Sequence, residues 1–199
     1  MTTAICPGSF DPITLGHLNI IRRASHIFDR VVVCVTVNSS KKSPLFQLEE
    51  RMELIQRVIA HLPNVTVDCS DRLLAEYAKQ FEGAVLVKGL RAVSDYESEA
   101  QMSLINQTVN PQLETLFLTS SAKYTYISST VVKEMARYGA DLRPFVPAEI
   151  LRDVEEKIKQ QEVSGNGFVH EVKSGQCLAE EGEEVSFCRD IDGVIDQLL

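Results

Sequence analysis

The stretch TAICPGSFDPITLGH, residues 3–17, decides the fold, because it joins a strand-like run to a helix-like segment through a glycine turn. Thr3–Cys6 has the apolar character of a buried strand, and Pro7-Gly8 ends it. From Leu15 to Phe28 the apolar residues recur at helical spacing. A strand, a turn and a helix in this order are typical of the first unit of an α/β fold.

The same alternation continues through most of the chain. Further strand-like segments lie at Val31–Val37, Val65–Cys69, Ala84–Val87 and Thr115–Leu118. Further helix-like segments lie at Leu48–Leu62, Leu73–Phe81, a stretch with a capping box at Ser94 and Glu97 that runs to Val109, Ser129–Tyr138, and a last helix opened by Pro147. We therefore predict a doubly wound, five-stranded parallel sheet in which the first and fourth strands lie side by side.

Ligands of such sheets bind outside the carboxyl ends of the strands, in the crevice where the strand order reverses. A polar string from Ser9 to His17 follows the first strand and leads into a helix. The free N–H groups of a helix N-terminus favour phosphate, and Gly16 lets a ligand approach the backbone closely. His17 adds a donor whose charge we expect to vary near neutral pH.

Three further polar clusters follow other strands. Lys88-Gly89-Leu90-Arg91 comes after the fourth strand, with Asp95 and Glu99 close behind, and two cations that flank a glycine there would hold phosphates. Tyr124–Thr130 comes after the fifth strand, and its serines are either plain helix caps or part of a phosphate site. Lys41-Lys42 comes after the second strand and is either a solvated surface pair or a cation pair that reaches over the crevice.

The composition excludes several classes of function. The formal charge is −8, and residues 162–199 hold nine acidic and two basic side chains, so the body of the chain is nearly neutral. Duplex nucleic acid is therefore a poor partner, since it calls for a basic face. No apolar run is long enough for a membrane helix and the N-terminus lacks a secretory signal, so we expect a cytoplasmic protein. The five scattered cysteines favour reduced thiols over disulfides or a zinc site.

The sequence divides into two predicted regions. Residues 1–160 form the α/β domain with its C-terminal helix, and residues 161–199 form an atypical acidic C-terminal extension. Ser164-Gly165-Asn166-Gly167 indicates a break between them. The acidic run Glu180–Glu184 opposes compact burial, so the extension is either a mobile tail or a small docked element.

Taken together, these motifs resemble those of the bacterial phosphopantetheine adenylyltransferases. The nucleotidyltransferase superfamily that contains them carries a (His/Thr)-x-Gly-His motif, here Thr14-Leu15-Gly16-His17. The resemblance covers residues 3–160 and includes the Lys-Gly-Leu-Arg, Asp95-Tyr96-Glu97 and Ile-Ser-Ser-Thr strings in the family's order. It implies a Rossmann-like nucleotidyltransferase fold and an enzyme that transfers the adenylyl group of ATP to 4′-phosphopantetheine, a step of coenzyme A synthesis.

The resemblance also implies a role for each matching residue. Two are catalytic: His17 stabilises the transition state on the α-phosphate, and Lys41 binds the acceptor phosphate. The implied ATP contacts are Ser9, Phe10, His17, Gly89, Leu90, Arg91, Glu99, Tyr124, Thr125, Tyr126, Ile127, Ser128, Ser129 and Thr130. The implied acceptor contacts are Ser9, Lys41, Leu74 and Lys88. Many members have arginine where this chain has Lys88, so bidentate phosphate binding is lost at that position.

The family further implies Mg²⁺, bound mainly through the nucleotide phosphates, a homohexamer, and coenzyme A as a candidate feedback ligand. The acceptor phosphate is already an anion near neutral pH, so it can attack the α-phosphorus of ATP in line and expel pyrophosphate. Such a reaction needs positioning and charge stabilisation rather than a nucleophilic side chain.

Two rival functions stay open. A related nucleotidyltransferase would act on nicotinate mononucleotide or use CTP, and the superfamily motif alone does not exclude it. A non-catalytic adenine-nucleotide sensor on the same fold would need phosphate-binding turns but neither a donor at His17 nor a cation at Lys41. The presence of both residues favours turnover.

Overall fold

The computed structural model describes residues 2–37 and 44–164 of the 199-residue chain, with side chains described to residue 161. Two expectations therefore lie outside the described residues. One is the position of Lys41 and Lys42, and the other is the form of nearly all of the acidic extension.

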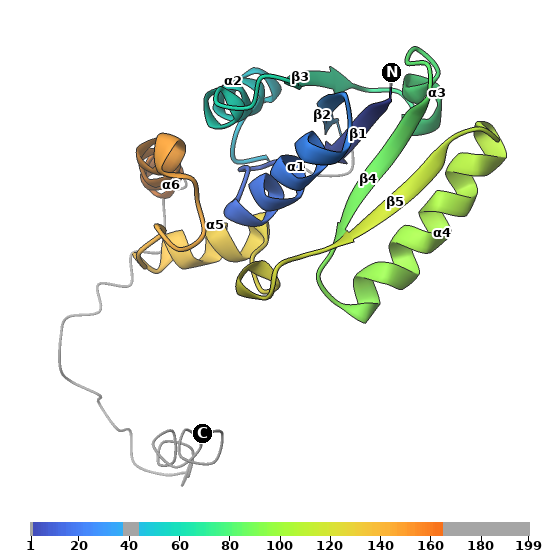
Figure 1. The fold of residues 1–199 in the computed structure, drawn as a ribbon. Helices are drawn as coiled ribbons and strands as arrows, with labels where there is room; N and C mark the ends of the chain where they lie inside the picture. Colours follow the sequence, from blue (N-terminus) through green and yellow to red (C-terminus); the bar gives the residue numbers. More distant parts are fainter. Residues whose placement is uncertain (1, 38–43, 165–199) are drawn as a thin grey trace, which may run out of the picture. The chain divides into compact units, whose positions relative to one another are not determined.

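Five parallel strands form one sheet in the order β3-β2-β1-β4-β5 (Figure 1). The strands are β1 (Thr3–Gly8), β2 (Arg30–Thr36), β3 (Val65–Ser70), β4 (Ala84–Leu90) and β5 (Glu114–Thr119). This order confirms the predicted doubly wound sheet, including the pairing of the first and fourth strands. The strand order reverses between β1 and β4, so a crevice is expected at their carboxyl ends.

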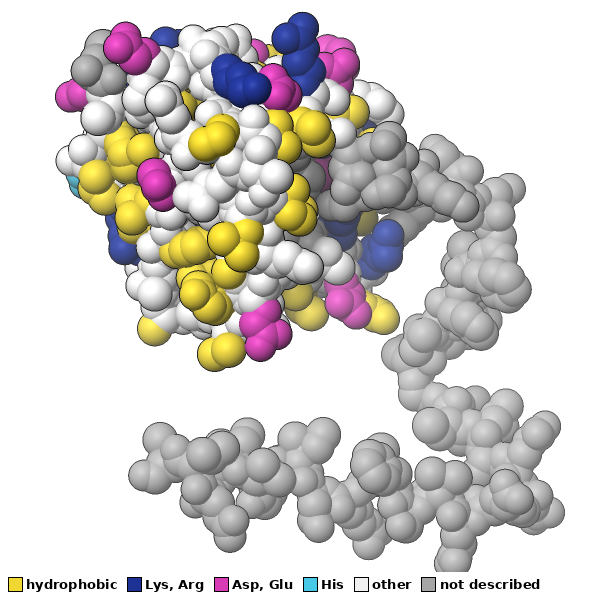
Figure 2. Space-filling view, turned by 90° about the vertical axis from the view of Figure 1, so that its right-hand side faces the viewer, with side chains coloured by type: hydrophobic (Ala, Val, Ile, Leu, Met, Phe, Trp, Pro, Cys, Tyr) yellow, Lys and Arg dark blue, Asp and Glu magenta, His cyan; other side chains and the backbone are white. Residues whose placement is uncertain are grey.

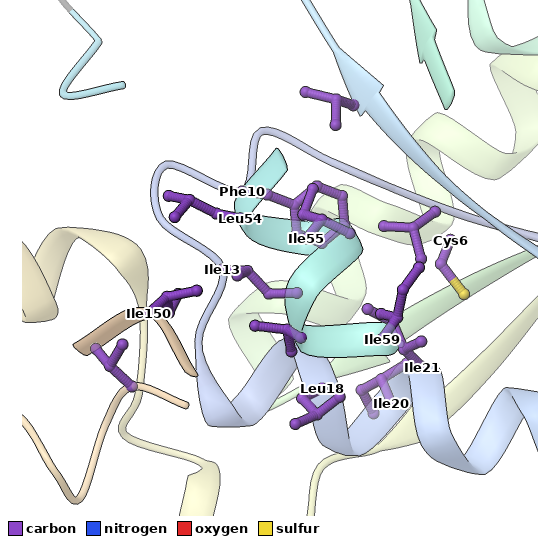
Figure 3. Close-up of a cluster of buried hydrophobic side chains, with 14 of the residues drawn as sticks. Cys6, Phe10, Ile13, Leu18, Ile20, Ile21, Leu54, Ile55, Ile59 and Ile150 are labelled. Carbon is purple, nitrogen blue, oxygen red and sulfur yellow. The ribbon is translucent and has the colours of Figure 1, made fainter. Parts of the chain in front are cut away.

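Helices lie on both faces of the sheet. The α-helices are α1 (Leu15–Ile27), α2 (Leu48–Ile59), α3 (Leu74–Ala78), α4 (Val93–Val109), α5 (Ser129–Arg137) and α6 (Leu151–Ser164), and two short 3₁₀ turns are η1 (Ala122–Tyr124) and η2 (Ala148–Ile150). One core cluster joins the sheet to α1, α2, α5 and α6, and part of it is drawn in Figure 3. A second cluster joins the opposite face to α3 and the end of α4. No helix in the described part of the chain is long and apolar enough to cross a membrane.

The valine-rich strand β2 shows why the sequence builds this sheet. Val31–Val35 are at most 1% exposed, and alternate residues reach opposite faces: Val33 belongs to the first core cluster and Cys34 to the second. Burying one such apolar side chain contributes about 1.5–3 kcal/mol relative to leaving it exposed. An apolar run without polar alternation is therefore the expected sequence of a central strand.

The start of α4 differs from the prediction. Ser94 and Glu97 do not form the expected capping box, because the helix begins at Val93 with Ala92 as its N-cap residue. β4 continues to Leu90, three residues beyond the predicted end, and pairs with β5 from Val85 to Leu90. The first turn of α4 is instead anchored by Asp95, whose carboxylate accepts from the backbone N–H of Arg91 at 3.1 Å. The capping boxes among the described residues lie instead at the starts of α1 and α2.

The last helix also begins later than predicted. Pro147 precedes the 3₁₀ turn η2 rather than opening an α-helix, and α6 starts at Leu151. The third helix is shorter than the predicted Leu73–Phe81 and covers only Leu74–Ala78. Neither difference alters the crevice, because all of these boundaries lie away from the ends of β1 and β4.

Candidate active site

A cavity of about 320 Å³ lies at the carboxyl ends of β1 and β4, where the fold predicts a ligand site. Three of the polar clusters found in the sequence converge on it. The residues with implied roles that line it are Ser9, Phe10, His17, Lys88, Gly89, Arg91, Glu99, Ile127, Ser128, Ser129 and Thr130. His17 and Arg91, which are 74 positions apart in the chain, therefore share one cavity.

The remaining residues with implied roles lie elsewhere. The carbonyl of Leu90 accepts a hydrogen bond from the backbone N–H of Ser120 at 2.8 Å. Tyr124, Thr125 and Tyr126 lie in or just after η1 and are not among the lining residues. Leu74 packs against the core cluster of the opposite face. The roles of these residues stay predictions, as does that of Lys41.

His17 is the third residue of α1, and its ring is fixed by the start of that helix. The backbone N–H of Thr14 donates to Nδ1 at 3.1 Å, while the Thr14 hydroxyl oxygen accepts from the backbone N–H of His17 at 3.3 Å. Because Nδ1 accepts this bond, the proton of the neutral ring sits on Nε2. Among the described residues Nε2 has no hydrogen-bond partner, so its N–H is available to a ligand in the cavity.

The expectation that the charge of His17 varies near neutral pH is wrong. Burial, which is the larger cause, and the positive charge of Arg91 together lower the pKa of His17 to about 4. An imidazole removed from water and set beside a guanidinium disfavours a second positive charge. His17 is therefore a neutral hydrogen-bond donor at physiological pH.

Phe10 supports the imidazole from the side. The two rings meet edge to face with their centroids 5.1 Å apart. Phe10 has a φ of +45°, which a bulky residue rarely adopts, and its side chain is only 3% exposed. Gly8 makes room for the ring, because a Cβ at that position would lie 3.0 Å from Cζ of Phe10. A glycine before the loop thus permits the position of an aromatic ring within it.

The cations at the carboxyl end of β4, Lys88 within the strand and Arg91 just after it, are each paired with a carboxylate from α4. Nε of Arg91 lies 3.0 Å from Oδ2 of Asp95, and Nζ of Lys88 lies 3.0 Å from Oε2 of Glu99. Arg91 also donates from Nη1 to the carbonyl of Ile127 at 3.3 Å. Burial tends to raise the pKa of Asp95, but hydrogen bonds from Arg91 outweigh it and hold that pKa below its ordinary value. All four charged side chains line the cavity.

The serine-rich stretch serves as a helix cap and also lines the cavity. Ser128 is the N-cap residue of α5, and its hydroxyl accepts from the backbone N–H of Val131 at 3.1 Å. Ser129 donates from its hydroxyl to the carbonyl of Pro12 at 2.8 Å. Ser128, Ser129 and Thr130 bring the N-terminal turn of this helix to the cavity, where a helix N-terminus favours an anion.

Sequence reasoning missed residues that hold the loop between β1 and α1. Asp11 is buried and accepts hydrogen bonds from three donors. Arg51, in α2, is also buried and donates from Nη1 to the carbonyl of Ser9 at 2.9 Å. A charged residue inside the apolar context of Phe10 and Ile13 was the available signal for Asp11, but its partners lie too far along the chain to be inferred.

The cavity wall includes acidic side chains and a thiol, the groups that metal binding and nucleophilic catalysis would use. The described residues include no group of three or more His, Cys, Asp or Glu side chains placed to hold a metal ion. The acidic side chains at the cavity wall, Asp95 and Glu99, are paired with cations instead. Cys6 also lines the cavity, and burial raises the pKa of its thiol to about 12. The thiol is therefore protonated at neutral pH and is a poor nucleophile.

Comparisons with known proteins identify the family of this chain. A family model described as cytidylyltransferase-like matches residues 5–135. A phosphopantetheine adenylyltransferase of Caldanaerobacter subterraneus subsp. tengcongensis is 49% identical over 160 residues, which are 80% of this chain and 99% of the relative. A second protein of that name, from Clostridium botulinum, is 47% identical over 161 residues, which are 81% of this chain and 98% of the relative.

A solved structure from Vibrio parahaemolyticus, described as a candidate nicotinate-nucleotide adenylyltransferase, has a TM-score of 0.58. It is 19% identical and covers 81% of this chain and 94% of its own. At that identity the likeness concerns the fold alone.

Proposed function

This chain belongs to the phosphopantetheine adenylyltransferases of the cytidylyltransferase-like family, and we infer that it transfers the adenylyl group of ATP to 4′-phosphopantetheine. The products are dephospho-coenzyme A and pyrophosphate. The observation that carries this function is the meeting of His17, Arg91 and the N-terminal turn of α5 at one cavity. These are three groups suited to a polyphosphate, and they come from three separate strand ends.

We propose that the reaction is a direct displacement at the α-phosphorus. The acceptor phosphate needs no general base, because it is already ionised near neutral pH. Positioning and stabilisation of the developing charge then supply most of the rate enhancement. Neutral His17, with its proton on Nε2, donates a hydrogen bond to an α-phosphoryl oxygen as negative charge grows there.

The other groups hold the two ends of the reacting system. Arg91 and the first turn of α5 bind the β- and γ-phosphates, because a guanidinium and free backbone N–H groups both suit phosphate oxygens. Lys88 and Lys41 bind the acceptor phosphate as point charges. Glu99 pairs with Lys88 at 3.0 Å, so an incoming phosphate competes with this carboxylate for the cation.

Mg²⁺ is part of the proposal, bound mainly through the nucleotide phosphates. This arrangement fits the site, because Mg²⁺ usually retains waters and takes few protein ligands when phosphates are present. When bound, the ion would neutralise charge on the departing pyrophosphate. Asp95 and Glu99 are the carboxylates of the cavity wall that could assist it, once their cations have turned to the phosphates.

We further propose that the enzyme is a homohexamer in the cytoplasm, with coenzyme A as a feedback ligand. The face that bears α4 supports self-association, because hydrophobic side chains gather on it (Figure 2). Large apolar side chains exposed on α4 and β5 are Val93, Tyr96, Met102, Leu104, Ile105 and Leu116. An apolar surface of this extent usually marks a protein interface. Sedimentation of the full chain tests the assembly.

An acceptor panel tests the function. Pyrophosphate release is measured with ATP and phosphopantetheine, and in parallel with nicotinate mononucleotide or with CTP as the nucleotide. We expect release only with ATP and phosphopantetheine. Tight ATP binding without any release would instead favour a nucleotide sensor. In the same assay Lys41→Ala should chiefly raise the KM for the acceptor, and a defect confined to ATP would contradict its role.

A further inference from the structure

Asp11 is a buried carboxylate in the middle of the loop between β1 and α1. Its side chain is 3% exposed, and all of its partners come from outside that loop. Oδ1 accepts from the backbone N–H of Phe46 at 2.9 Å, and Oδ2 accepts from the backbone N–H of Leu45 at 3.1 Å. Nζ of Lys133 lies 3.0 Å from Oδ2. A buried carboxylate is tolerated only when it is paired in this way.

The partners of Asp11 belong to two different sides of the site. Lys133 lies in α5, one helical turn after Thr130, which lines the main cavity. Leu45 and Phe46 lie just before the start of α2, a few positions after Lys41 in the sequence. One carboxylate therefore ties α5 to the segment just before α2, across 122 and 34 positions of sequence.

A second hollow of about 230 Å³ lies beside the main cavity, and Asp11 is on its wall. Ser9 lines both hollows, so they meet at the loop between β1 and α1. Arg51 also lines the second hollow and holds the carbonyl of Ser9 at 2.9 Å. The loop is thus fixed from the side of α2 at Ser9 and from the side of α5 at Asp11.

We propose that Asp11 is a positioning residue that sets the acceptor side and the nucleotide side of the site relative to each other. The proposal rests on the proposed function, since it assigns one substrate to each side. Asp11 touches neither substrate and acts through Leu45, Phe46 and Lys133. A mutation far from the reacting atoms that misplaces them by about 1 Å can lower the rate on the order of 100-fold. Loss of the contacts of Asp11 should therefore have a measurable effect on the kinetics.

Two variants separate the contact of Asp11 with Lys133 from its contacts with Leu45 and Phe46. Asp11→Asn keeps the size of the side chain but has a single acceptor oxygen, which cannot serve both backbone N–H groups and Lys133. Lys133→Met removes only the ion pair and leaves the bonds to Leu45 and Phe46. Lys79→Met is the matched control, because Lys79 pairs with Glu76 at 2.7 Å on the exposed surface of another region.

Kinetics with both substrates and amide hydrogen exchange are measured for each variant. We expect Asp11→Asn to raise the KM of both substrates and to lower kcat/KM about 10- to 100-fold. Lys133→Met should raise the KM for ATP and leave the acceptor KM unchanged. The amides of Leu45 and Phe46 should exchange faster in Asp11→Asn only. Lys79→Met should match the wild type in all of these measurements.

The proposal is overturned if Asp11→Asn shows wild-type KM values and loses kcat only in proportion to its unfolded fraction. If Asp11→Asn does not fold, an unchanged ATP KM in Lys133→Met overturns it. Wild-type enzyme that releases no pyrophosphate with phosphopantetheine would sink the proposed function instead. In that case the hydrogen exchange of the Leu45 and Phe46 amides still tests whether Asp11 holds this segment. Unaltered protection of these amides in Asp11→Asn would reject that role.

Discussion

The two chain segments that meet at the cavity are held in different ways. The loop between β1 and α1 is fixed by contacts that each include one buried charged side chain, namely Asp11 with Lys133 and Arg51 with the carbonyl of Ser9. The segment from β4 into α4 carries its cations in partly exposed ion pairs, with the side chain of Arg91 39% and that of Asp95 25% exposed. Exposed ion pairs contribute little to stability, whereas removing the partner of a buried charge is strongly destabilising. The first segment is therefore preorganised, and the second can rearrange when phosphate arrives.

The largest effect is expected at the preorganised segment. His17→Ala removes the Nε2 donor and should lower kcat by about 10²–10³-fold, the usual cost of losing one donor that stabilises a transition state. Circular dichroism should show a retained fold. Wild-type-like turnover in this variant would exclude His17 from the mechanism. It would also remove the reason to treat the first segment as the preorganised part of the site.

A substitution at the contact between the two segments should be the next largest. Gly89, at the end of β4, packs on α1, and a Cβ there would lie 2.8 Å from Cγ1 of Ile20. Gly89→Ala should therefore destabilise the protein by about 1–3 kcal/mol, the usual cost of overpacking. Urea denaturation of Gly89→Ala and of Gly89→Ala/Ile20→Val measures the loss and its relief. Equal stability in all three proteins would mean that the contact is not tight.

A smaller effect is expected at the adjustable segment. Asp95→Asn keeps an acceptor for Arg91 but removes a negative charge that competes with the triphosphate. The KM for ATP should fall by a few-fold, about the 0.2–1 kcal/mol of an exposed ion pair, and less at high salt. ATP titrations at low and high salt measure it. A KM that rises tenfold would show that Asp95 is as fixed as Asp11.

The last prediction concerns pH, and near neutral pH its effect is the smallest. Because the pKa of His17 lies at about 4 in the folded protein and near 6.5 when unfolded, its contribution to stability is complete above about pH 6.5. That contribution should fall as the pH drops from 6.5 toward 4, where the unfolded chain binds a proton and the folded one does not. An NMR titration of the imidazole, assigned with His17→Gln, measures this pKa. A midpoint near 6.5 would contradict a neutral donor.

Most of the fold could be predicted from the sequence, because its signals are local. The valine run of β2 indicates burial on both faces from a few consecutive residues. The first strand was found with a small error at its end, because β1 continues through Pro7 and Gly8, which were predicted to end it. The start of α4 was mispredicted, since Ser94 and Glu97 match a capping box while β4 extends to Leu90 by pairing with β5. The carboxylate that accepts a backbone N–H at this helix start belongs to Asp95, which the capping-box pattern does not include.

The site was predictable only in part, because many of its contacts join residues that are far apart in the sequence. The three polar strings follow strand ends, and the topology rule brings strand ends together. The contacts that hold these strings are not local: Asp11 and Lys133 are 122 positions apart, and Arg51 and Ser9 are 42 apart. The tautomer and low pKa of His17 likewise depend on Thr14, on burial and on Arg91, which a motif does not reveal.

The protonated thiol of Cys6 has a stereochemical consequence. A thiolate in the wall of the cavity could accept the adenylyl group first and pass it on, and two successive displacements would retain the configuration at phosphorus. Because burial raises the pKa of Cys6 to about 12, the thiolate that such a covalent route needs is not formed at neutral pH. Adenosine triphosphate made chiral at its α-phosphorus with sulfur should therefore give a product of inverted handedness.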